Sequence, residues 1–184
     1  KRLVVGIAHD PRRGGYWTLA ANGRLYKQRS LGAKPRRVAD IRAVAERAPD
    51  PFDTEGNPTE SNPFGLNVDR KGRALVTDAA ANALVRVNHR GKARVIARFG
   101  TEMVATDHLP AEMQPPGGLP PELPAESVPT DVQVDRKGRI YVSELKGFPF
   151  RPGSARIWRI DANAKAKRPA VCSTDADERR KCRS

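Results

Sequence analysis

The sequence predicts an all-β fold made of repeated units of four antiparallel strands. The hexapeptide Val-Asp-Arg-Lys-Gly-Arg occurs twice, at residues 68–73 and 134–139. The flanking segments also align, since SNPFGLNVDRKGRALVTD (61–78) matches SVPTDVQVDRKGRIYVSE (127–144) at serine, proline, valine and glycine positions. Between turn residues, apolar and polar residues alternate in short runs, which is typical of half-buried strands. Repetition of a whole unit predicts a repeat architecture.

The first unit, residues 1–41, is a diverged copy of this pattern. Its strands are expected at residues 5–10, 16–19 and 23–27. Asp40 is then expected to act as the N-cap of a short helix. The linker 42–61 therefore combines a short helix with a loop.

The second and third units, residues 62–99 and 128–172, are the clear copies. Each contains a hairpin whose glycine, Gly72 or Gly138, can adopt a positive φ without steric cost. The linker between these units, residues 100–127, is rich in proline, which cannot donate hydrogen bonds to a strand ladder. This linker is therefore expected to be a loop or polyproline-like.

Four antiparallel strands with a glycine hairpin in each unit are typical of a β-propeller blade. The chain would then hold about three blades, with a β-sandwich as the alternative fold. Neighbouring blades bury each other's faces, and the outer faces of the first and last units would lack partners unless further blades or another chain cover them. The residues expected to pack between the sheets are Ile7, Leu66, Val68, Leu75, Val85, Val87, Val132, Val134, Tyr141, Val142 and Ile157.

The order of several distinctive segments resembles one known family. These segments are VADI before the short helix, LVTDAAANALVRV, a PPGG-containing insert, SVPTDVQV and YVSELKGFPFRPGSARIWRI. Together they resemble the ScyD/ScyE-type β-propeller family, named for the scytonemin pigment gene cluster, whereas Val-Asp-x-x-Gly is common to all NHL-type repeats. The resemblance implies an NHL-like propeller of about six blades, exported to the extracellular space or the periplasm, with an accessory role in a biosynthetic or cell-envelope process.

The formal charge of +13 suggests a nucleic-acid partner, because clustered Lys and Arg release counterions from phosphates. The distribution of charge argues against one, since residues 101–135 hold no Lys or Arg but several Asp and Glu. In addition, aromatic residues do not interleave with the basic ones as a stacking platform requires. Nucleic acid is therefore disfavoured as a partner. The longest apolar runs are far too short for a membrane span.

Asp78 and Glu144 match each other in the repeat, each at the end of the second strand. At equivalent ends of neighbouring blades they could share one rim, where calcium or a cationic ligand binds. Asn62 and Thr130, beside the prolines that open the innermost strands, are weaker candidates by the same geometry. The alternative is a structural role, in which each carboxylate accepts hydrogen bonds from the amides of the next turn.

The loop KGFPFRPG, residues 146–153, separates the second and third strands of its blade and has no counterpart in the preceding repeat. Phe148 and Phe150 have two interpretations. They form an apolar platform for a ligand or partner, flanked by Glu144 and Arg151, or they tuck inward and cap the blade.

Catalytic and metal-binding signatures are sparse. His9, His89 and His108 stand in no HxxH or HExxH spacing, and no GxSxG or P-loop motif occurs. The sequence therefore favours a non-catalytic propeller that binds a small molecule or a protein on its rim and needs no cofactor. The alternative is a metal-dependent lactonase of the gluconolactonase type, in which a calcium ion would need several oxygen ligands in one channel.

Cys172 and Cys182 have no second cysteine pair or histidine nearby, so they are candidates for a disulfide rather than for metal ligands. A bridge would close a short loop and contribute about 2 to 3 kcal/mol to stability. It would also fit an exported protein. Unpaired thiols are the alternative.

Overall fold

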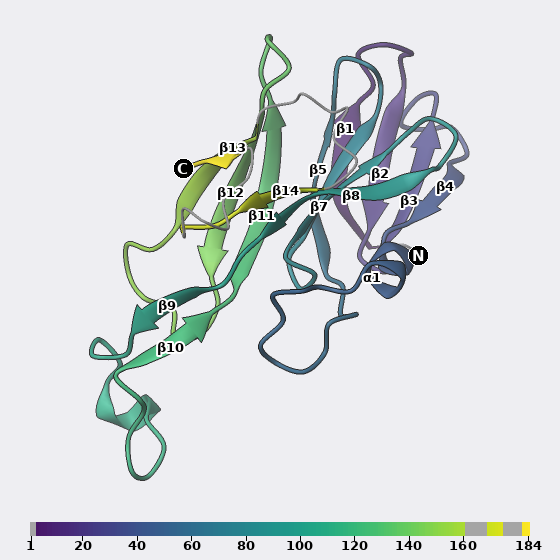
Figure 1. The fold of residues 1–184 in the computed structure, drawn as a ribbon. Coiled ribbons are helices and arrows are strands. Elements are labelled where there is room, and N and C mark those ends of the chain that lie inside the picture. The colour runs from purple at the N-terminus through teal and green to yellow at the C-terminus, as the bar shows by residue number, and fades with distance from the viewer. Residues whose placement is uncertain (1–2, 161–168, 175–181) are drawn as a thin grey trace.

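The computed structural model describes residues 3–160, 169–174 and 182–184, and these residues form a nearly all-β fold (Figure 1). The first sheet is an antiparallel meander in chain order. Its strands are β1 (Val4–His9), β2 (Tyr16–Ala20), β3 (Arg24–Gln28) and β4 (Arg36–Asp40).

The second and third sheets repeat this meander. The second contains β5 (Pro63–Val68), β6 (Ala74–Asp78), β7 (Ala83–Val87) and β8 (Ala93–Phe99), and β14 (Ala170–Cys172) pairs with β8 in parallel. The third contains β11 (Ser127–Val134), β12 (Ile140–Lys146), β13 (Arg156–Ile160) and β15 (Cys182–Arg183).

The boundaries of the third sheet differ from the expected unit 128–172. Its fourth strand, β15, lies beyond residue 172, while β14 belongs to the second sheet. Residues 161–168 of the expected unit lie outside the described residues. The alternation of residues within a strand cannot reveal which sheet will accept that strand as an edge, because edge pairing depends on which neighbour leaves backbone groups unpaired.

The two linkers also differ from expectation. Helix α1 (Arg42–Arg47) has Ile41 as its N-cap and no side-chain cap, because Asp40 ends β4 and pairs with Arg37 at 2.7 Å. Within residues 100–127, β9 (Glu102–Ala105) and β10 (Glu122–Ala125) form a separate two-stranded sheet, which we call the arm, with a short helix, η1 (Ala111–Met113), between them. Proline is tolerated there because both arm strands are edge strands.

Two clusters of buried side chains hold the three main sheets face to face. Along β6 and β7, Val76 and Val85 pack toward the first sheet, whereas Leu75 and Leu84 pack toward the third. The middle sheet is therefore buried on both faces, which is the β-propeller-like arrangement of successive blades. The largest side chains in these clusters are Trp17, between the first and second sheets, and Trp158, between the second and third.

The expectation that Ile7, Tyr141 and Ile157 pack between sheets is wrong. Tyr141 is next to the buried Val142 on β12 and therefore lies on the opposite face of that strand. The two isoleucines also lie outside the core. They are 53% and 62% exposed. In the strand register, Ile7 pairs with Thr18 and Ile157 pairs with Ser143, while the adjacent residues Trp17 and Val142 point into the core. Because side chains alternate between the faces of a strand, both isoleucines lie on the outer faces of the terminal sheets.

A disulfide joins Cys172 of β14 to Cys182 of β15. Both cysteines are buried in the cluster between the second and third sheets. The bridge therefore links the edge of one sheet to the edge of the next.

Candidate functional site

The residues singled out from the sequence gather at one end of the sheets, which we call the loop end (lower part of Figure 1). It comprises the connections 41–62 and 100–126, the β6–β7 turn at 79–82 and the loop 147–155. Asp78 pairs with Pro63 across β5 and β6, and Glu144 pairs with Pro129 across β11 and β12. The two carboxylates therefore occupy equivalent positions in neighbouring sheets.

Asp78 is almost completely buried and its oxygens are taken up by local donors. Oδ1 accepts hydrogen bonds from the backbone N–H of Asn62 (2.7 Å) and Ala81 (3.3 Å), and Oδ2 accepts one from Ser61 Oγ (2.6 Å). Burial raises the pKa of Asp78 against the lowering effect of these hydrogen bonds. Asp78 thus ties the start of β5 to the β6–β7 turn.

Glu144 is equally buried but has charged partners. The Trp158 indole N–H donates to Oε2, and the Lys146 ammonium lies 2.7 Å from Oε1. Arg156 lies 3.9 Å from the same oxygen. Glu144 and Asp78 therefore belong to separate networks, and neither side chain offers a free pair of oxygens to a ligand.

Asn62 and Thr130 make local hydrogen bonds, Asn62 just before β5 and Thr130 within β11. Asn62 is exposed and uses its backbone to bond Asp78 and Ala79. Thr130 Oγ1 bonds Ser143 Oγ at 2.9 Å, while its carbonyl accepts from Thr77 Oγ1 at 3.2 Å. These contacts connect neighbouring strands of the second and third sheets.

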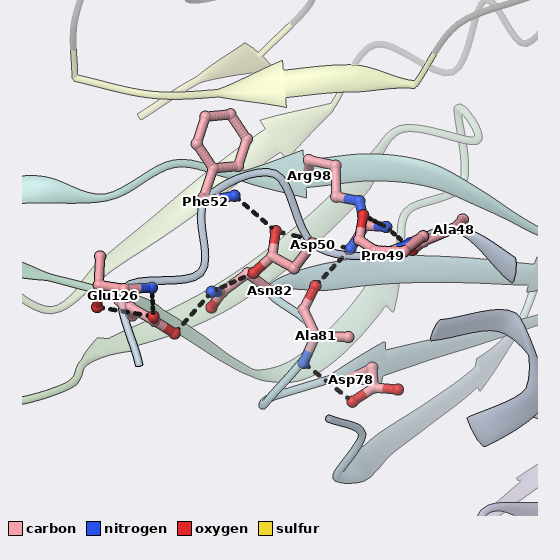
Figure 2. Close-up of polar contacts among 10 residues, drawn as sticks. Ala48, Pro49, Asp50, Phe52, Asp78, Ala81, Asn82, Arg98 and Glu126 are labelled. Carbon is pink, nitrogen blue, oxygen red and sulfur yellow. Dashed lines mark hydrogen bonds and ion pairs between the residues drawn. The ribbon is translucent and has the colours of Figure 1, made fainter. Parts of the chain in front are cut away.

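A buried polar cluster at this end was not predicted from the sequence (Figure 2). The Asn82 amide Nδ2 donates to Asp50 Oδ2 at 2.7 Å and to Glu126 Oε2 at 3.0 Å. Arg98 donates to the carbonyls of Ala81 (2.6 Å) and of Ala48, and lies 3.8 Å from Asp50. The cluster therefore joins the linker 42–61, the β6–β7 turn and the end of β10.

The environment of this cluster explains its residue types. Asn82 has φ of +45°, a left-handed conformation that Asn tolerates better than most residues. Burial raises the pKa of Asp50, and the nearby Glu126 carboxylate acts in the same direction. The other oxygen of each carboxylate is held by the linker, Asp50 Oδ1 by the N–H of Phe52 and Glu126 Oε1 by Thr54.

Phe148 and Phe150 are exposed, at 42% and 60%. Of the two interpretations, the one in which they tuck inward and cap the blade is therefore wrong. Their rings meet edge to face with centroids 5.8 Å apart. The arm supports their loop, since His108 Nε2 bonds the Pro149 carbonyl at 2.8 Å and Arg151 pairs with Asp107 at 2.8 Å.

A shallow hollow of about 390 Å³ lies between the arm and this loop. A second ion pair, between Arg156 and Glu102 at 2.6 Å, is formed by two residues of its lining. The lining combines acidic, basic and apolar groups, among them Glu102, Met103, Glu122, Arg151, Pro152 and Arg156. The phenylalanine pair precedes the lining residue Arg151 in the same loop and supplies an exposed apolar surface.

The donor sets test whether a divalent cation fits the predicted carboxylates. N–H and O–H donors surround Asp78, and an ammonium and an indole N–H face Glu144. These positive or donating groups occupy the lone pairs that calcium needs. No group of three or more His, Cys, Asp or Glu side chains in the described part of the chain has the arrangement of a metal site.

None of the helices among the described residues is long and apolar enough to cross a membrane.

Comparisons with known proteins give two solved structures that resemble this chain over most of its length. One is virginiamycin B lyase from Staphylococcus aureus, with 15% identity and a TM-score of 0.42, covering 96% of this chain and 47% of the lyase. The other is a protein of unknown function from Bacteroides caccae, with 14% identity and a TM-score of 0.36, covering 91% of this chain and 64% of that protein. This chain thus spans about half and about two thirds of their lengths. No family model and no curated protein matches the sequence.

Proposed function

We propose that this chain is a non-catalytic binding module of an exported β-propeller of the ScyD/ScyE type. Its ligand is an apolar or aromatic group, carried by a small molecule or a protein, that docks on the phenylalanine pair and the hollow beside it. The observation that carries the proposal is the exposure of Phe148 and Phe150 on a loop that the arm holds in place.

The bracing of the loop supports this proposal. An exposed aromatic pair contributes little to folding, since its apolar area stays in water. The contacts from His108 and Asp107 to the loop nevertheless fix its position. Holding a surface in its bound shape reduces the entropy cost of binding. The hollow adds charged groups of both signs that can orient a polar substituent of the ligand.

The lactonase alternative has less support. It requires oxygen ligands that converge on one cation, and the donors around Asp78 and Glu144 oppose that role.

The proposal also includes the outer faces of the first and third sheets. We infer that these exposed faces, which carry Ile7 and Ile157, are covered by further blades or by another chain.

The experiment compares the double variant Phe148→Ala/Phe150→Ala with Phe64→Ala, which removes another exposed phenylalanine from β5. Binding of naphthalene and indole fragments is measured by saturation-transfer NMR, together with the thermal midpoint. We expect the double variant to lose fragment binding with little change in midpoint, and Phe64→Ala to retain it. Unchanged fragment binding in the double variant, or a large fall in its midpoint, would contradict the proposal.

A further inference from the structure

Four hairpin turns lie at the end of the sheets opposite the loop end, and each contains at least two Lys or Arg residues. They are the β1–β2 turn (residues 10–15, DPRRGG), the β5–β6 turn (69–73, DRKGR), the β7–β8 turn (88–92, NHRGK) and the β11–β12 turn (135–139, DRKGR). We call them the basic turns. Those of β1–β2, β5–β6 and β11–β12 lie together in the upper part of Figure 1.

The aspartates of these turns are used to build the turns. Asp69 Oδ1 accepts the N–H of Lys71 (2.9 Å) and of Arg73 (3.0 Å), while Oδ2 pairs with the Arg73 guanidinium at 2.6 Å. Asp135 makes the same three contacts in the third sheet. Each acidic charge is therefore neutralised within its own turn.

Asp10 is neutralised in a related way in the first sheet. It pairs with Lys27 at 2.6 Å and accepts the N–H of Arg12 and Arg13 at 3.0 Å. After these pairings, each basic turn keeps two exposed cations that form no ion pair with a described carboxylate. These cations are Arg12, Arg13, Arg70, Lys71, Arg90, Lys92, Arg136 and Lys137.

The basic turns lie close together in space. Arg70 Nη1 donates to the Arg136 carbonyl at 2.6 Å, which joins the second sheet's turn to the third's. A Cβ atom at Gly72 would lie 2.9 Å from Asp10 Oδ1, so the first two turns also touch. A hollow of about 480 Å³ opens among the turns of the three sheets, and its lining includes Pro11, Arg70 and Arg136.

The surroundings of His89 show the same crowding of cations. Partial desolvation lowers its pKa, and the charges of Arg13, Arg90, Lys27 and Arg12 lower it further. Three of these cations belong to the first sheet, although His89 belongs to the second. The positive field of the basic turns therefore extends across sheets.

We propose that the basic turns bind an acidic polysaccharide. Neutralising the anionic groups of a polymer releases counterions, and arginine pairs well with carboxylate and sulfate oxygens. No Phe, Trp or Tyr lies in these turns to stack on bases, and no large apolar side chain in them would enter a bilayer. The disulfide is typical of proteins outside the cytosol, where acidic polysaccharides are the common linear polyanions.

The test uses the full chain and one cation from each sheet. Arg12→Gln/Lys71→Gln/Lys137→Gln is compared with Arg24→Gln/Arg42→Gln/Arg47→Gln, which removes three exposed cations near the loop end. Fluorescent heparin and polygalacturonate, a duplex DNA and phosphatidylglycerol vesicles serve as probes over a range of salt concentrations. Because each lost contact weakens binding several-fold at about 0.1 M salt, we expect the first variant to bind the polysaccharides about 10- to 100-fold more weakly and the second to bind them normally.

Three results would overturn the proposal. These are equal losses in the two triple variants, tighter binding to duplex DNA or to the vesicles than to either polysaccharide, and no polysaccharide binding at low salt. If the first variant does not fold, Lys71→Gln/Lys137→Gln replaces it, since neither lysine side chain forms an ion pair with a described carboxylate. Phe148→Ala/Phe150→Ala should bind the polysaccharides normally, which separates this site from the proposed aromatic site.

Discussion

The pKa values of aspartates are shifted in opposite directions at the two ends of the sheets. At the basic turns, burial alone would raise the pKa of Asp10 and Asp135, but hydrogen bonds from Lys27, Arg139 and turn amides lower both pKa values. At the loop end, burial outweighs the hydrogen bonds and raises the pKa values of Asp50 and Asp78. The aspartates of the basic turns are thus held in the charged form, whereas burial at the loop end favours the protonated form of Asp50 and Asp78.

The largest expected effect concerns Glu144, because its partner Lys146 is also buried, with a side chain only 2% exposed. Glu144→Ala would leave that ammonium in the core with Glu102 as its remaining carboxylate, 3.5 Å away. Breaking a buried pair on one side typically costs about 3 to 5 kcal/mol. We expect Glu144→Ala to lower the free energy of unfolding, measured with urea, by about 3 kcal/mol, since Glu102 compensates in part.

The matched control for this variant lies at the other end of the same strand pair. Asp135→Ala removes a carboxylate whose side chain is 24% exposed and whose partner Arg139 reaches water. Its loss should be clearly smaller than that of Glu144→Ala. If the two variants lose equal free energy of unfolding, burial does not make the carboxylate at the loop end more important for stability than the one in the basic turn.

Acid should separate the two ends by the order in which carboxylates take up protons. Asp50 and Asp78 have raised pKa values, so they should protonate above 3.8, and Asp10 and Asp135 should protonate below it. Carboxyl-carbon NMR during an acid titration measures this order directly. The reverse order, or a single shared midpoint, would refute the contrast.

The sign of the effect on stability follows from the same order. Because Asp50 and Asp78 bind protons more tightly in the folded chain, their contribution is greatest at low pH and falls as pH rises through their folded-state pKa values. The contribution of Asp10 and Asp135 is present above 3.8 and is lost as pH falls through their lowered pKa values. Amide hydrogen exchange should therefore show the basic turns opening first in strong acid.

The repeat made one part of the molecule predictable. The two copies carry the same turn signals, so the four-strand meanders and the positive φ of Gly72 and Gly138 follow from local sequence. The equivalence of Asp78 and Glu144 follows from the same alignment and appears in the strand register. These features depend on residues close together in the chain.

The remaining features depend on contacts that leave no repeated pattern. Asn82 meets Asp50 and Glu126 across 32 and 44 residues, and the alignment of the two copies does not show that these side chains meet. Ile7 and Ile157 were placed on the wrong face because alternation shows which residues share a face, but not which face a neighbour covers. Long-range packing decides these questions.

The smallest expected effect is a shift in the pKa of His89. Desolvation and the charges of Arg13, Arg90, Lys27 and Arg12 hold this pKa below 6.5. Salt screens charges between exposed groups, so raising the salt concentration should move the pKa of His89 upward. Arg13→Gln should move it upward at low salt, and a bound polyanion should do the same. Histidine NMR titration measures each case, and a pKa unaffected by salt would mean that desolvation alone sets it, which would weaken the contrast between the two ends.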